Sequence, residues 1–258
     1  MILRGKPFAQ MILDELREKD VPKGKLVVVQ VGDNSVSSLY VAAKEKVAKD
    51  LKIDFECKCL PAEITESELM AEIEKLNRDR KVRRILIQLP LPSHLNQKKI
   101  AAAISPQKDI DGFHYILSGG GSFVPPTVLA IDGILDFYQI SKEDKKILIV
   151  GGGFLVGTPL ERFWRGKYNV EILKKGATGY FKKLKKSDII ILATSGGGNF
   201  TPDNFKNGAT VVDASTLIED GKLRGDIISQ DWPDNLNLVP SPGGIGPVTV
   251  AMLFKNFY

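Results

Sequence analysis

Two side chains spaced one helical turn apart could carry proton-transfer chemistry. Tyr40 and Lys44 lie within residues 36–49, a segment whose apolar residues recur at helical spacing. Residues four apart share a helix face, so we expect both side chains on one largely apolar face. An amine partly removed from water has a lowered pKa and can exchange protons near neutral pH. From spacing alone the alternative stays open: a lysine that buries its stem and keeps its ammonium in water.

Three further stretches place a polar group beside rigid proline or glycine. Residues 88–92 read QLPLP, residues 108–114 read KDIDGFH and residues 240–249 read PSPGGIGPVT. In open α/β sheets, ligands bind beside the carboxyl ends of the strands, where such turns occur. Each stretch taken singly is also explained by a structural turn.

A glycine string follows one strongly apolar strand-like segment. Residues 147–157 read ILIVGGGFLVG, an expected strand that runs into glycines and then a helix. Such a turn lets backbone N–H groups approach a pyrophosphate at a helix N-terminus. The glycines are spaced G-x-G-x-x-x-G instead of the usual G-x-G-x-x-G, so a simple tight turn remains an alternative.

The next expected strand ends at Lys174 and Lys175. Dinucleotide sites that prefer NAD carry an acidic residue at this place, which binds the ribose hydroxyls. Two lysines would instead attract the 2′-phosphate of NADP. This favours NADP, with NAD possible, although both residues could equally be exposed surface lysines.

Strand-like and helix-like segments alternate along the whole chain, which predicts parallel βαβ units and an α/β fold. The sequence at residues 119–122, GGGS, interrupts the pattern and indicates a linker or loop. We therefore expect two α/β lobes with a cleft between them. Residues 1–118 form the first lobe, residues 119–246 a Rossmann-like second lobe, and a helix over 247–258 returns to the first. The expected strands are 26–31, 56–60, 85–88, 147–150, 170–173, 189–193 and 211–212.

Composition excludes several classes of protein. The 258 residues are 43% hydrophobic with a net charge of +5, which is ordinary for a globular enzyme and too weak a charge to indicate nucleic-acid binding. The basic run at residues 182–186 is interpreted as a solvated helix face. No apolar run approaches the ~20 residues of a membrane span, and the N-terminus has no signal-peptide core. We expect a cytoplasmic protein.

Cys57 and Cys59 are the only cysteines, and they fall in an alternating, strand-like segment. Side chains two apart on a strand point the same way. We predict buried, reduced thiols packed in the core, with no disulfide. No metal site is expected, because the chain has only two histidines, His94 and His114.

Taken together and in order, these strings resemble the bifunctional methylenetetrahydrofolate dehydrogenase/cyclohydrolase family. The resemblance runs nearly end to end, from residues 4–6 to residues 249–251. Its most specific parts are Y-x-x-x-K at 40–44, QLPLP at 88–92, KD-x-DGFH at 108–114 and PGG-x-GP-x-T at 242–249.

The resemblance implies roles on the folate side. Lys44 matches the lysine that moves protons during methenyl hydrolysis, and Gln88 its hydrogen-bonding partner. Tyr40 matches the aromatic that stacks on the aminobenzoyl ring, and Asp111 the carboxylate that binds the amino edge of the pterin. Pro242, Gly243 and Gly244 match the loop between folate and nicotinamide.

The resemblance also implies a nucleotide site and a biological setting. The implied activity is oxidation of 5,10-methylenetetrahydrofolate with NADP, or NAD, followed by hydrolysis to 10-formyltetrahydrofolate. The implied setting is one-carbon metabolism that serves purine biosynthesis, in a homodimer. The implied cofactor contacts are Gly151, Gly152, Gly153, Val156, Gly157, Lys174, Lys175, Thr127 and Ile245.

The departures from the family pattern cluster in the nucleotide half. Gly151-Gly152-Gly153 stands where the family has Gly-Arg-Ser, and that arginine contacts the 2′-phosphate of NADP. Lys174 and Lys175 could replace it. Two alternatives therefore stay open: a cyclohydrolase or folate-binding protein with a degenerate dehydrogenase half, and a shikimate-type dehydrogenase with the same two-lobe plan.

Overall fold

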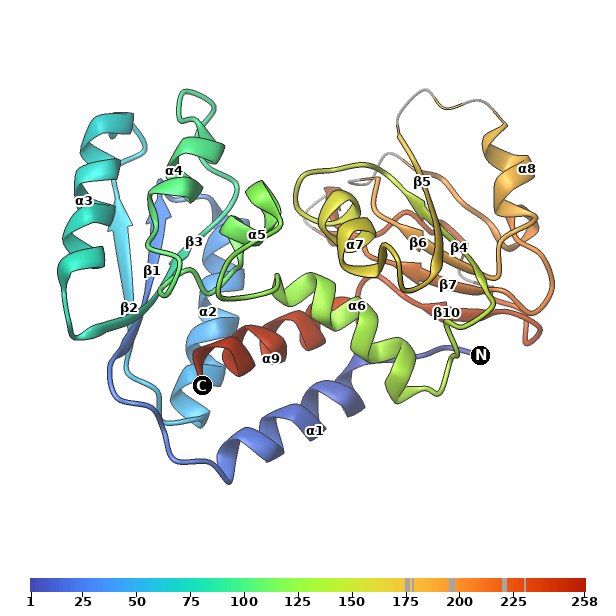
Figure 1. Ribbon diagram of the computed structural model, residues 1–258, viewed down its shortest axis with the longest axis horizontal. Helices are drawn as coiled ribbons and strands as arrows, with labels where there is room; N and C mark the ends of the chain where they lie inside the picture. Colours follow the sequence, from blue (N-terminus) through green and yellow to red (C-terminus); the bar gives the residue numbers. More distant parts are fainter. Residues whose placement is uncertain (175–176, 178, 195–197, 220–221, 230) are drawn as a thin grey trace. The chain divides into compact units, whose positions relative to one another are not determined.

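The computed structural model describes residues 1–174, 177, 179–194, 198–219, 222–229 and 231–258. The chain forms two compact units (Figure 1). The three-stranded unit comprises residues 12–126 and 253–258, and the five-stranded unit comprises residues 1–11 and 127–252. Within the described parts, no helix is long and apolar enough to cross a membrane.

The three-stranded unit is built on a parallel sheet in the order β2-β1-β3, formed by β1 (Lys25–Val31), β2 (Phe55–Leu60) and β3 (Val82–Ile87). β1 lies in the centre and is buried from Leu26 onward, as the predominantly apolar sequence of residues 26–31 predicts. The helices of this unit are α2 (Ser35–Asp50), α3 (Glu66–Arg78), α4 (Gln97–Ala103) and α5 (Phe113–Ser118).

The start of α3 follows directly from local sequence. The Thr65 hydroxyl accepts a hydrogen bond from the Glu68 backbone N–H, and the Glu68 carboxylate accepts one from the Thr65 N–H. This reciprocal capping box satisfies two backbone donors that the first turn leaves open. The sequence TESE at residues 65–68 has the spacing of such a box and by itself predicts a helix that begins here, as the structure confirms.

The five-stranded unit contains a parallel sheet in the order β10-β7-β6-β4-β5. The parallel pairing confirms the predicted α/β fold, whereas β10 and a short hairpin were not predicted. The strands are β4 (Lys146–Val150), β5 (Asn169–Leu173), β6 (Ile189–Leu192), β7 (Thr210–Asp213) and β10 (Asn237–Val239); the hairpin is β8 (Leu217–Glu219) with β9 (Lys222–Arg224); the helices are α6 (Pro126–Phe137), α7 (Gly157–Trp164), α8 (Tyr180–Leu184) and the 3₁₀ turn η1 (Pro202–Asn204).

Two helices, α1 (Gly5–Arg17) and α9 (Ile245–Phe257), contribute residues to both units. The last residues of α9 are bound to β3 by two arginines. Arg83 Nε donates to the Phe257 carbonyl at 2.7 Å, and Arg84 Nε donates to the Asn256 carbonyl at 3.0 Å. These bonds satisfy carbonyls that the end of a helix leaves without intrahelical partners.

The two cysteines correct one prediction. Cys57 and Cys59 point to the same side of β2, as expected, but both are exposed. β2 is an edge strand, with a hydrogen-bonded neighbour on one side only. The alternating pattern therefore identified the shared direction of the side chains but not their exposure.

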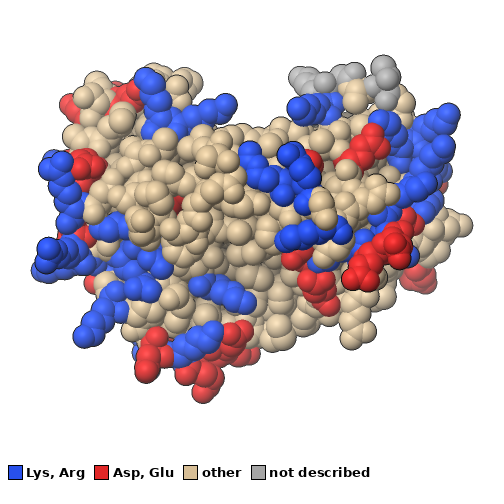
Figure 2. Space-filling view, viewed as in Figure 1, with Lys and Arg blue, Asp and Glu red and all other residues tan. Residues whose placement is uncertain are grey.

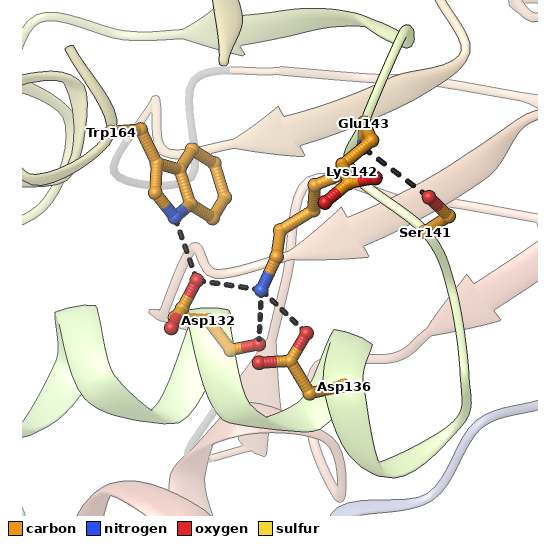
Figure 3. Close-up of polar contacts among 6 residues, drawn as sticks. All are labelled: Asp132, Asp136, Ser141, Lys142, Glu143 and Trp164. Carbon is orange, nitrogen blue, oxygen red and sulfur yellow. Dashed lines mark hydrogen bonds and ion pairs between the residues drawn. The ribbon is translucent and has the colours of Figure 1, made fainter. Parts of the chain in front are cut away.

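A buried lysine joins three segments of the five-stranded unit (Figure 3). Lys142 Nζ donates to Asp132 Oδ1 at 2.7 Å and to Asp136 Oδ1 at 2.6 Å, and its side chain is 4% exposed. Trp164 Nε1 of α7 donates to the same Asp132 oxygen at 2.8 Å. Burial lowers the pKa of Lys142, but the two carboxylates outweigh it and hold the pKa above its ordinary value. The cluster holds α6 against α7 and against the segment that leads into β4.

We expect Lys142→Met to lower the stability of the five-stranded unit by about 3 kcal/mol, because it leaves the Asp132 carboxylate without its cation. At about 2 to 4 °C per kcal/mol, the thermal midpoint should fall by several degrees in calorimetry. Lys186→Met is the matched control, since Lys186 is exposed. Equal midpoints for both variants would contradict the role of the cluster.

Candidate active site

The structure joins Lys44 and Gln88 directly. Lys44 Nζ on α2 donates to Gln88 Oε1 at 2.7 Å, and Gln88 follows the last residue of β3. The Gln88 side chain is buried, and its Nε2 donates to the Leu89 carbonyl at 2.7 Å. That second bond fixes which way the amide faces, so its oxygen points at the amine. This hydrogen bond thus brings together two residues that are 44 positions apart in the sequence.

Asp111 lies close enough to Lys44 for each charge to affect the other. Burial lowers the pKa of Lys44, and the Asp111 carboxylate opposes this. Burial raises the pKa of Asp111 to about 6, which the Lys44 ammonium opposes and the Asp109 carboxylate reinforces. Both shifts move the two groups toward proton exchange near neutral pH. Such a pair, next to a buried amide, can exchange a proton with a bound substrate.

The loop that carries Asp111 is pinned to β3. The Ile85 N–H donates to the Lys108 carbonyl at 2.7 Å, so the residues before Asp111 pair with the strand that ends at Gln88. Gly112 follows with φ +69°, and a Cβ there would lie 2.7 Å from the Phe123 carbonyl oxygen. Only glycine fits this turn without displacing its neighbours. The turn directs Asp111 and starts α5.

Asp109 is a site residue that sequence reasoning did not select. Its side chain is 2% exposed, and its Oδ2 accepts the His114 backbone N–H at 2.8 Å. Its Oδ1 is buried and has no hydrogen-bond partner within the described residues. Burial raises the pKa of Asp109, against backbone N–H groups that lower it. No spacing rule singles it out, because Asp109 lies four residues before α5 and the N-cap position is occupied by Gly112.

The remaining folate-side candidates are divided between the units. Tyr40 is partly exposed on α2, one turn before Lys44. Pro242, Gly243 and Gly244 follow β10 in the five-stranded unit. Gly243 has φ +94°, and a Cβ on Gly244 would lie 2.3 Å from the Pro240 carbonyl oxygen. This turn therefore requires glycines for its own packing, whatever else it contacts.

The glycine loop after β4 is shaped by close backbone approach. A Cβ on Gly151, which has φ +108°, would lie 2.2 Å from the Ala193 carbonyl oxygen. A Cβ on Gly157, the first residue of α7, would lie 1.8 Å from the Gly151 carbonyl oxygen. Gly153 differs: it is exposed, and a Cβ there would meet nothing within 4 Å. An open glycine backbone before a helix N-terminus fits the pyrophosphate of a dinucleotide.

The other cofactor candidates lie around this loop or on neighbouring elements. The Lys174 side chain is exposed and passes over Gly152. A Cβ added to Gly152 would lie 2.9 Å from the Cγ of Lys174. Lys175 lies outside the described residues. Val156 is the residue before α7, Thr127 is in the first turn of α6, and Ile245 is the buried first residue of α9.

A buried acidic network at the carboxyl ends of β6 and β7 was not predicted. Asp226 accepts bonds from the Thr194 hydroxyl at 2.7 Å and the Gly198 N–H at 3.1 Å, and also from the Ser215 hydroxyl. Asp213 accepts the Ser215 N–H at 3.1 Å. Burial raises the pKa of Asp213 to about 6, backbone N–H groups lower it, and Asp226 raises it further. The network fixes the loops at this edge of the sheet.

Comparison with protein families decides the assignment. Residues 3–111 match the model for the tetrahydrofolate dehydrogenase/cyclohydrolase catalytic domain, and residues 125–258 match that for the NAD(P)-binding domain of the same family. The chain belongs to this family. Its second domain is thus an NAD(P)-binding domain, and its α/β architecture of parallel sheets is that of the family.

The similarity of this tetrahydrofolate dehydrogenase/cyclohydrolase to its relatives covers the whole chain. The bifunctional protein FolD of Streptococcus mutans is 35% identical and that of Halothermothrix orenii 36%, covering 100% and 99% of this chain and 96% and 95% of theirs. The FolD crystal structure from Campylobacter jejuni has a TM-score of 0.91 at 33% identity, covering 100% of this chain and 96% of that one.

Two further solved structures bear on the alternatives. The Trypanosoma brucei enzyme, complexed with NADP and an inhibitor, has a TM-score of 0.89 at 26% identity and covers 100% of this chain and 95% of that one. Shikimate dehydrogenase from Thermus thermophilus has a TM-score of 0.58 at 13% identity, with 90% and 93% coverage. The second likeness shows a common fold alone, and the shikimate alternative is not favoured.

Proposed function

We propose that this enzyme oxidises 5,10-methylenetetrahydrofolate to the methenyl form with NADP, and hydrolyses the methenyl form to 10-formyltetrahydrofolate. The observation that carries the proposal is the Lys44–Gln88 hydrogen bond of 2.7 Å beside the raised-pKa carboxyl of Asp111. The second reaction needs a group that can take and return a proton, and a partly desolvated lysine supplies one.

Lys44 carries the proton transfers of the proposed hydrolytic step. Water attacks the methenyl carbon, and the neutral amine of Lys44 accepts a proton from that water. The resulting ammonium returns this proton to the ring nitrogen as the carbon–nitrogen bond opens. The remaining hydroxyl proton of the intermediate leaves to water as the carbonyl forms, so the cationic methenyl substrate gives the neutral formyl product and one released proton. Gln88 Oε1 accepts a hydrogen bond from Nζ at 2.7 Å throughout, so it holds the amine in place while the charge changes.

Asp111 and Tyr40 position the substrate in this proposal. A carboxylate accepts two hydrogen bonds at once, which suits the amino edge of a pterin. Tyr40 offers an aromatic face one helical turn before the amine, which suits the aminobenzoyl ring. Pro242, Gly243 and Gly244 are proposed as further substrate contacts on the ground of the family resemblance alone.

The dinucleotide would be held by the open backbone of the glycine loop, from Gly151 to Gly157 with Val156, and by Thr127 and Ile245. When bound, it supplies the hydride acceptor for the oxidation. The Gly153 backbone presents no side chain to obstruct its approach. Lys174, whose side chain crosses Gly152, offers a cation beside this loop.

We expect the double variant Lys174→Ala/Lys175→Ala to raise the KM for NADP about tenfold and to leave the KM for NAD unchanged, because loss of charge-assisted contacts to the 2′-phosphate costs at least ~1.4 kcal/mol. Figure 2 shows other basic side chains gathered over the region of α8, mixed with acidic ones. Lys182→Ala/Lys185→Ala is therefore the charge-matched control. An unchanged KM for NADP would exclude compensation for the lost arginine.

The direct test is a spectrophotometric assay with methylenetetrahydrofolate and each dinucleotide in turn. Reduction of NADP, together with hydrolysis of methenyltetrahydrofolate, supports both activities. The altered glycine loop favours one second candidate, a cyclohydrolase with a degenerate dehydrogenase half. Hydrolysis without reduction of either dinucleotide would establish that candidate and overturn the bifunctional proposal.

The proposed setting is the cytoplasm, where the 10-formyl product would supply purine biosynthesis, and the proposed assembly is a homodimer. The family resemblance of the whole chain supports both. The molar mass in solution, measured by light scattering at working concentration, tests the assembly. A value near the 28.4 kDa of a single chain would contradict it.

A further inference from the structure

The exposed thiol pair on β2 lies outside the folate chemistry. Cys57 Sγ and Cys59 Sγ are 3.6 Å apart and both side chains are exposed. Lys58, between them, points the other way, where its ammonium contacts Glu72 of α3. The Glu45 carboxylate of α2 contributes to the electrostatic surroundings of Cys57, which indicates that the thiols lie on the face of β2 toward α2. The strand thus presents two thiols side by side on one face.

The spacing of the two sulfurs suits a bridging atom better than a disulfide. A disulfide needs sulfurs ~2.05 Å apart and Cα atoms within ~6.8 Å. Residues two apart on a strand have Cα atoms ~6.6 Å apart, which is near that limit. A single atom bonded to both sulfurs at ~2.3 Å holds them roughly 3.3 to 3.8 Å apart, for bond angles from about 90° at a pyramidal atom to about 109° at a tetrahedral one. The observed 3.6 Å lies within this range.

We propose that Cys57 and Cys59 form a dithiol site that captures trivalent arsenicals. In the described part of the chain, no group of three or more His, Cys, Asp or Glu side chains could hold a metal ion. A divalent metal, which prefers four ligands, would therefore find only two here. Monosubstituted trivalent arsenic needs only two sulfurs, because its third bond goes to its own organic group.

The reaction balances without an oxidant. Two S–H bonds of the thiols and two As–O bonds of the hydrated arsenical break, two As–S bonds form, and two waters leave. Arsenic stays trivalent and neither sulfur is oxidised. Burial, followed by the neighbouring thiol and Glu45, raises the pKa of Cys57 to about 11, so this thiol is protonated at neutral pH. Reagents that need a thiolate should therefore react slowly with it.

Phenylarsine oxide added to the full-length protein tests the site. After washing with excess 2-mercaptoethanol, a monothiol, intact mass spectrometry should find one phenylarsenic group per chain. A small 1,2-dithiol should remove it. Cys57→Ser and Cys59→Ser should each retain it at least ~100-fold more weakly, because they lose the intramolecular second bond. Retention by either single variant, or release from the wild type by the monothiol, would overturn the proposal.

A geometric control separates the folded arrangement from mere nearness in sequence. Lys58→Cys combined with Cys59→Ser leaves two thiols adjacent in the chain but on opposite faces of β2. Folded, this variant should lose the arsenical to the monothiol; unfolded in denaturant, it should retain it. Retention in the folded state would overturn the claim that β2 aligns the thiols. Unchanged methenyl hydrolysis in every variant verifies that each is folded.

Discussion

Lys44→Met should abolish hydrolysis of methenyltetrahydrofolate, lowering kcat by about 10²- to 10⁴-fold, the usual contribution of a positioned acid–base group. Methionine keeps an unbranched side chain of similar length but cannot take or return a proton. Gln88 Oε1 would lose the hydrogen bond that it accepts from Lys44 Nζ at 2.7 Å. Folate affinity should change little, because Asp111 and Tyr40 remain in place.

The readout is the loss of methenyl absorbance at several pH values, beside equilibrium binding of a folate. Lys46→Met is the matched control, since Lys46 is exposed on the same helix. Burial lowers the pKa of Lys44. The rate of hydrolysis by the wild type should therefore rise with increasing pH, in a pH range lower than that in which an exposed lysine titrates. Wild-type hydrolysis by Lys44→Met, or equal loss in the Lys46 control, would remove Lys44 from this role.

Local signals predicted the elements well where one rule dominated. The capping box of Thr65 and Glu68 located the start of α3, and the predominantly apolar run at residues 26–31 located β1 as a strand buried on both faces. These rules hold because neighbours in the chain decide them. The Lys44–Gln88 contact came instead from resemblance to a family, since no spacing rule links residues 44 positions apart.

Features set by tertiary surroundings were not predictable from pattern. Cys57 and Cys59 alternate like core residues, yet an edge position leaves them exposed. Asp226 and Lys142 look like surface charges in the sequence, but the fold buries both among partners supplied by other elements. β10 has only three residues, and its pairing with β7 defines it more than its composition does.

The division of the site residues between the two units predicts that the two activities can be separated by mutation. Lys44, Gln88 and Asp111 all belong to the three-stranded unit, and the bonds that hold them come from that unit alone. The glycine loop belongs to the five-stranded unit and is shaped by contacts between β4, α7 and the end of β6. Damage to this loop should therefore spare hydrolysis.

Gly157→Ala should raise the KM for the dinucleotide about 10- to 100-fold and leave methenyl hydrolysis near the wild-type rate. The new Cβ would lie 1.8 Å from the Gly151 carbonyl oxygen, a backbone atom that cannot move aside without moving the loop. Overpacking of this kind costs ~1–3 kcal/mol, which corresponds to that range in affinity. Reduction of NADP and loss of methenyl absorbance, followed on one preparation, give both rates.

Gly120→Ala is the matched control, because a Cβ there would meet only the Ser118 hydroxyl at 3.7 Å. It should leave both KM and hydrolysis unchanged, since the loop after α5 is exposed. If Gly157→Ala reduces NADP with the wild-type KM, the turn after β4 does not hold the dinucleotide. If it loses hydrolysis as well while remaining folded, the two chemistries share more of the chain than the separate hydrogen-bond networks of the two units indicate.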